Sequence, residues 1–124
     1  MTSIKVSYLT VDDLVSRYAE AAETHGHASR RGDHETANEQ YSTLATVYAE
    51  LRRRGPEAQR ALLALLEHPE PAVRGWTAAH ALEFSPEDGE PALTELVAEG
   101  GPIGFNAEMT LEEWRQGNLR FPDP

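Results

Sequence analysis

The chain has 124 residues, which fits one compact domain, and it contains no cysteine, which excludes thiol catalysis, disulfides and zinc sites with cysteine ligands. No signal-peptide core and no stretch near the roughly 20 apolar residues of a membrane span are present, so a cytoplasmic, non-membrane protein is expected. The net charge of −10 repels phosphate backbones, so nucleic acid is not expected as a partner.

Two amphipathic helices are predicted between residues 10 and 54. Thr10 is a predicted N-cap, and Asp33 is predicted to cap the second helix, which ends near Arg54 before Gly55. Residues 1–9 are predicted to form an extended arm, because one short alternating segment has no strand to pair with. Apolar residues recur at three- and four-residue steps and predict the buried faces: Val11, Leu14, Val15, Tyr18 and Ala22, then Ala37, Tyr41, Leu44, Tyr48 and Leu51.

Prolines divide residues 56–117 into four further predicted helices. Pro56, Pro71 and Pro102 each follow a turn and suit the first helical position. The fifth helix has two candidate starts, Pro86 and Pro91. Leu119 and Phe121, the apolar residues of the tail 118–124, are candidates to dock back onto the core. The chain is therefore predicted to be a single helical domain of about six helices, with a first helix pair at 10–54 and two further pairs at 56–117.

The last four predicted helices form a repeat. Leu62, Leu65 and Pro71 recur as Leu93, Leu96 and Pro102, at a spacing of 31. Beyond the proline the spacing becomes 32. Helix pairs repeated at such a period are typical of α-solenoids, whose units must stack to bury their apolar faces. The pairs at a spacing of 32 are Val73 with Phe105, Ala79 with Leu111, and Leu82 with Trp114.

The segment that starts at Pro71 resembles the second helix of a HEAT repeat. It reads Pro71-Ala72-Val73-Arg74 and then Ala78-Ala79-His80-Ala81-Leu82, with one more residue between the arginine and the alanine pair than the repeat has. In HEAT repeats the alanines allow close helix packing and the arginine pairs with an acid near the turn. The resemblance implies an all-α, HEAT-like α-solenoid of stacked antiparallel pairs. Residues 73–117 also resemble a family of small bacterial helical proteins of unknown function, which implies no active site.

Acidic residues gather on the repeat-bearing half of the chain. Residues 1–62 hold eight Lys/Arg against nine Asp/Glu, whereas residues 63–124 hold three against twelve. Such a surface attracts a basic protein, although surface acids can also serve solubility alone. The leading hypothesis is a non-enzymatic protein-binding module, for which an immunity protein that neutralises a bacterial toxin is an analogy of size and charge. The predicted partner-binding residues are Glu87, Asp88, Glu95, Glu99, Glu108 and Glu112.

The alternative hypothesis is a metal- or ligand-binding enzyme with a site at His25, His27 and His34, near the junction of the first two helices. Two residues on a helix that are two positions apart point to different faces, so no metal or other cofactor is expected there. The basic cluster Arg52, Arg53, Arg54 and Arg60 is interpreted as charge that complements the end of a helix. No nucleophile or phosphate-loop motif is present, and the oligomeric state stays open.

Overall fold

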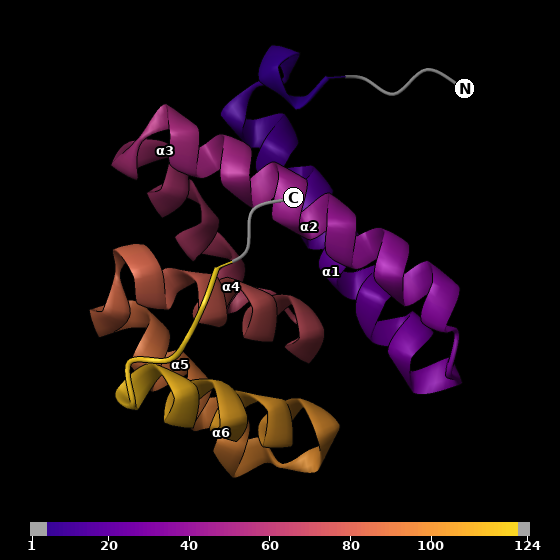
Figure 1. Cartoon of the computed structure of the whole chain (residues 1–124), viewed down its shortest axis with the longest axis vertical. Coiled ribbons are helices and arrows are strands. Elements are labelled where there is room, and N and C mark those ends of the chain that lie inside the picture. Colours follow the sequence, from indigo (N-terminus) through magenta and orange to yellow (C-terminus); the bar gives the residue numbers. More distant parts are fainter. Residues whose placement is uncertain (1–4, 122–124) are drawn as a thin grey trace. The chain divides into compact units, whose positions relative to one another are not determined.

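The computed structural model describes residues 5–121, and within that range every regular element is helical. The prediction of an all-α protein is thereby confirmed. Contacts divide these residues into two compact units, residues 5–61 and residues 62–121, where the sequence predicted a single domain. None of the helices in the described range is long and apolar enough to cross a membrane. Figure 1 shows the elements in chain order.

The first unit is built on a helical hairpin, α1 (Val11–Arg31) and α2 (His34–Arg54), followed by the short helix α3 (Pro56–Arg60). Thr10 caps α1 as predicted, because its hydroxyl accepts from the Asp13 amide at 3.0 Å. The Asp13 carboxylate accepts from the Thr10 amide in return, which completes a capping box. The Asp33 carboxylate likewise caps α2 by accepting from the amide of Thr36.

The core of the first unit lies between α1 and α2. It contains Leu14, Tyr18 and Ala22 of α1 and Ala37, Leu44, Tyr48 and Leu51 of α2, as their spacing predicted. For α2, the prediction of burial is wrong at one residue, Tyr41. The side chain of Tyr41 is 43% exposed, because the buried face of α2 follows Leu44 and Val47 instead.

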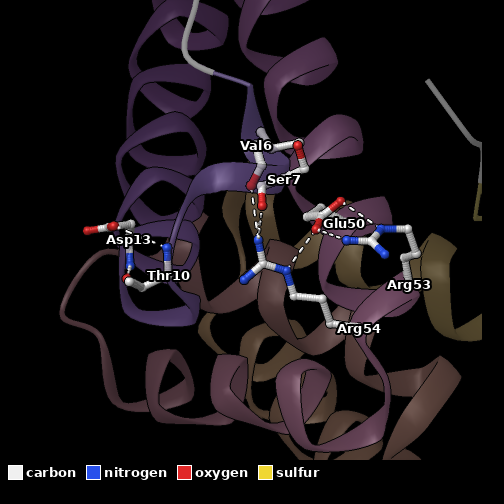
Figure 2. A network of polar contacts seen from close by, with 7 residues as sticks. All are labelled: Val6, Ser7, Thr10, Asp13, Glu50, Arg53 and Arg54. Atoms are coloured by element: carbon white, nitrogen blue, oxygen red, sulfur yellow. Dashed lines mark hydrogen bonds and ion pairs between the residues drawn. The ribbon is translucent and has the colours of Figure 1, made fainter.

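The segment before α1 is held to the end of α2 by a charge network around the buried Glu50 (Figure 2). Glu50 is 7% exposed and accepts from the guanidinium groups of Arg53, at 2.6 and 3.0 Å, and Arg54, at 2.7 Å. Arg54 also donates to the backbone carbonyl of Val6 at 3.0 Å. The N-terminal arm is consequently not wholly extended. Val6–Tyr8 form one turn of 3-10 helix, η1, and residues 1–4 lie outside the described range.

The second unit consists of α4 (Pro71–Phe84), α5 (Pro86–Glu99) and α6 (Gly101–Arg115), preceded by the 3-10 segment η2 (Ala61–Glu67). The stretch predicted as one helix from Pro56 is therefore α-helical only as far as Arg60. The fifth helix begins at Pro86, with Pro91 inside its second turn. Leu119 and Phe121 pack against the core as expected, and residues 122–124 of the predicted tail lie outside the described range.

The three helices of the second unit approach one another closely at two glycines. A Cβ at Gly89 of α5 would lie 2.7 Å from the carbonyl oxygen of Ala78 in α4. A Cβ at Gly104 of α6 would lie 2.7 Å from the carbonyl oxygen of Leu96 in α5. Only glycine fits between these backbones, so the two positions fix how α5 lies on α4 and how α6 lies on α5.

Candidate protein-binding surface

The six acidic residues predicted to bind a partner all lie exposed on α5 and α6. Glu87 and Asp88 are in the first turn of α5, Glu95 and Glu99 follow along the same helix, and Glu108 and Glu112 are one turn apart on α6. The sequence thus placed them correctly on the surface of one unit. Their surroundings divide them into two groups.

Four of the six make side-chain contacts inside the second unit, although Glu112 only accepts a hydrogen bond from Gln116, one turn on at the C-cap of its own helix, at 3.4 Å. Glu99 forms an ion pair with Arg74 of α4 at 2.9 Å, which ties the end of α5 to the beginning of α4. Buried Ser85 lies with its hydroxyl oxygen 2.6 Å from one carboxylate oxygen of Glu87 and 2.6 Å from one of Asp88. A hydroxyl has one proton, so it donates to one of these carboxylates at a time. Glu99, Glu87 and Asp88 have evident structural roles.

The remaining acids keep their charge unpaired. Glu95, Glu108 and Glu112 form no ion pair with any residue in the 5–121 range, and neither does Glu113, the neighbour of Glu112 on the exposed side of α6. The one Lys or Arg of α6, Arg115, forms an ion pair with Glu90 of α5 at 3.1 Å. The uncompensated charge of this surface is therefore concentrated on α6, and Glu113 belongs to it although the sequence analysis did not select it.

Two apolar side chains lie on the same helix and were also missed. Phe105 is 63% exposed and Met109 is 45% exposed. The repeat alignment paired Phe105 with Val73, which is fully buried, so that pairing is wrong. The helical periodicity of the sequence could have predicted their exposure. Phe105 and Met109 fall opposite Ala107 and Leu111, the residues by which α6 contacts the core.

The three histidines of the first unit are not grouped with one another as candidate ligands of one metal ion. His25 and His27 lie on α1 and His34 is the first residue of α2. Within either unit taken alone, the described residues contain no group of three His, Asp or Glu ligand atoms within 4.8 Å of one another. Partial burial lowers the pKa of His25, which favours a neutral imidazole at pH 7.

The basic cluster at the end of α2 is accounted for by the fold. Arg53 and Arg54 bind Glu50, and the guanidinium of Arg52 lies 5.7 Å from the centre of the Tyr48 ring. These contacts engage three members of the predicted cluster, whereas Arg60 lies exposed at the end of α3. All four arginines stand in the last turn of a helix, which agrees with their interpretation as helix-terminal charge.

Fold and surface together define a small all-helical protein with an acidic second unit. The chain belongs to the family described as "Domain of unknown function (DUF2019)", whose model matches residues 12–114. It is similar in structure to the protein RPA1889 from Rhodopseudomonas palustris CGA009, with a TM-score of 0.88. The two are 24% identical, and the match covers 95% of this chain and 98% of the other, so they share a fold. No curated protein matches this chain.

Proposed function

We propose that the protein is a non-enzymatic interaction module that binds a basic protein through the acidic surface of its second unit. The observation that carries the proposal is the charge left unpaired on that surface. Residues 62–121 contain eleven Asp/Glu and three Arg, and two of those arginines are engaged with Glu99 and Glu90. Glu95, Glu108, Glu112 and Glu113 are left to act on a partner.

The arrangement of these acids supports binding more than solubility. Glu108 and Glu112 lie one turn apart and Glu113 is adjacent, so like charges are concentrated on one helix at some cost to its stability. Acids that served solubility alone would be as effective if they were dispersed among cations. Concentrated charge instead steers a basic partner toward one face and makes its association sensitive to salt.

The helical architecture also supports the proposal. We interpret the second unit as HEAT-like, since Pro71 begins α4, buried Ala78 lies where α5 approaches closely, and Arg74 pairs with an acid beside the turn after α5. Stacked helix pairs present extended surfaces to partners. A cytoplasmic protein that neutralises a basic toxin is one concrete form of this function.

The experiment is partner identification followed by charge reversal. A protein that co-purifies with the chain is identified, and its affinity is measured for the wild type and for the double variant Glu108→Lys, Glu112→Lys. The matched control is Glu35→Lys, Glu39→Lys, which reverses two exposed acids one turn apart on α2 and changes the net charge equally. We expect the α6 variant alone to lose about tenfold or more in affinity, with the wild-type complex weakening as salt is raised.

Equal losses in the two double variants would show that only total charge matters. No loss in either variant would contradict the assignment of the surface. Circular dichroism of each variant checks that the helices are retained.

A further inference from the structure

The outer face of α6 carries an apolar pair inside its acidic surface. Phe105 and Met109 are four residues apart and therefore neighbours on the helix. They lie on the face opposite buried Gly104, Ala107 and Leu111, so packing within the second unit does not use them. Leu119 and Phe121, which follow α6, pack on the core of the unit.

The acids surround this pair on the same face. By helical phase, Glu112 lies on the line of Phe105 and Met109, and Glu108 and Glu113 lie on either side of it. We call these five residues the α6 face. An apolar centre with a charged rim is the anatomy of a protein interface, in which aromatic and methionine side chains supply the buried contacts.

We infer that the α6 face binds a basic amphipathic helix, whose apolar side chains pack on Phe105 and Met109 while its lysines or arginines contact the surrounding glutamates. This inference rests on the proposed function and specifies the partner of that surface. A helix is the partner that fits, because its residues one turn apart match the spacing of the two anchors and its adjacent positions can present cations to the rim. The thioether of Met109 can adapt to partners of different shape.

A second copy of this chain is a poorer occupant of the same face. Two α6 faces packed together would bring Glu108, Glu112 and Glu113 of one copy against the same acids of the other. None of these acids forms an ion pair among the described residues, and Arg115 of the same helix pairs with Glu90, so like charges would oppose association. Charge complementarity thus selects a basic partner.

The test uses two synthetic helical peptides of equal positive charge. The first carries leucines one turn apart among lysines, and the second carries serines in place of the leucines. Binding to the full chain is measured by calorimetry at fixed salt. We expect the leucine peptide to bind about tenfold or more tightly than the serine peptide, because buried apolar anchors carry most of the energy of an interface.

Phe105→Ala, Met109→Ala should abolish the preference for the leucine peptide, and Glu108→Lys, Glu112→Lys should weaken both peptides. Tyr8→Ala, which removes an aromatic side chain that is 79% exposed in the first unit, is the control and should preserve the preference. All three variants alter exposed side chains, so the fold is expected to persist.

The outcomes separate this inference from the proposed function. Equal binding of the two peptides, with a loss on charge reversal, would overturn the apolar anchor and leave the acidic surface standing. Binding unaffected by charge reversal would overturn both. Concentration-dependent dimerisation that Phe105→Ala, Met109→Ala abolishes, seen by sedimentation, would overturn the basic helix in favour of a second copy.

Discussion

Glu50 is the buried acid of the first unit, and it accepts hydrogen bonds from two arginines at the end of α2. Its buried carboxylate is held by hydrogen bonds from Arg53 and then Arg54, which lower its pKa from 4.5 to about 2. Since the folded pKa is below the unfolded one, the contribution of Glu50 is complete above about pH 4.5 and is lost as the pH falls toward about 2. The same contacts orient Arg54 toward the carbonyl of Val6.

Replacement of Glu50 by Gln keeps the shape but removes the charge. We expect the free energy of unfolding to fall by about 2 kcal/mol at pH 7, which is the scale of one hydrogen bond to a charged group, since the Gln amide oxygen still accepts from a guanidinium. The gap between variant and wild type should narrow as the pH falls below about 4.5. Urea unfolding followed by circular dichroism at several pH values measures this difference in the free energy of unfolding. A gap that does not change with pH would contradict the charge-based account.

Thr77 presents the opposite case, a buried polar atom without a partner. Its side chain is fully buried in α4, and its hydroxyl oxygen has no hydrogen-bond partner among the described residues. Replacement by Val, which has nearly the same shape, should raise the free energy of unfolding by about 1 kcal/mol. Thr94→Val is the control, because that hydroxyl is exposed and donates to the carbonyl of Glu90, and its effect should be near zero.

Both tryptophans, Trp76 and Trp114, lie in the second unit, so their fluorescence reports on the unit that contains Thr77. A loss of stability in Thr77→Val larger than in Thr94→Val would show that the Thr77 hydroxyl is paired in solution.

At the scale of elements, α5 lies close to α4 and α6 lies close to α5, and this predicts that replacing the glycine at either contact lowers stability. Gly89→Ala and Gly104→Ala each place a Cβ 2.7 Å from a backbone carbonyl oxygen, which must move away. We expect each to lower the free energy of unfolding by about 1–3 kcal/mol through overpacking. Gly75→Ala is the matched control, because the nearest side-chain atom would lie at 3.6 Å, an ordinary contact.

Gly75 lies inside α4, where Ala is favoured over Gly by up to about 1 kcal/mol. Gly75→Ala should therefore be neutral or stabilising in the same tryptophan fluorescence assay. If Gly89→Ala and Gly104→Ala behaved like Gly75→Ala, the helices would not be packed as closely as the structure has them.

The elements were largely predictable because their boundaries are encoded locally. Thr10, Asp33 and the prolines at 56, 71, 86 and 102 mark helix starts whatever the tertiary contacts are. Burial within a helix was harder to predict. Tyr41 and Phe105 fit a sequence pattern yet are exposed. For Phe105 the reason is the neighbouring Gly104, through which α6 packs on the backbone of α5, so that the buried face is centred on small residues.

At the scale of the whole molecule, the structure shows where on the chain the excess acidic charge is left without ion pairs. The sequence showed that acids outnumber bases in its second half, but it does not reveal which acids are neutralised across helices. The Arg74–Glu99 and Arg115–Glu90 pairs each join residues 25 positions apart. Only the folded unit distinguishes these acids from Glu108, Glu112 and Glu113, which form no ion pair among the described residues.

The central claim is that a basic partner binds on the outer face of α6. The most direct measurement is chemical-shift mapping by NMR on the isotope-labelled full chain, titrated with the leucine–lysine peptide. The account predicts that the largest amide shifts fall between Phe105 and Glu113, and that they are much reduced in Glu108→Lys, Glu112→Lys. Shifts concentrated on α1 and α2, or spread evenly over all exposed acids, would contradict it.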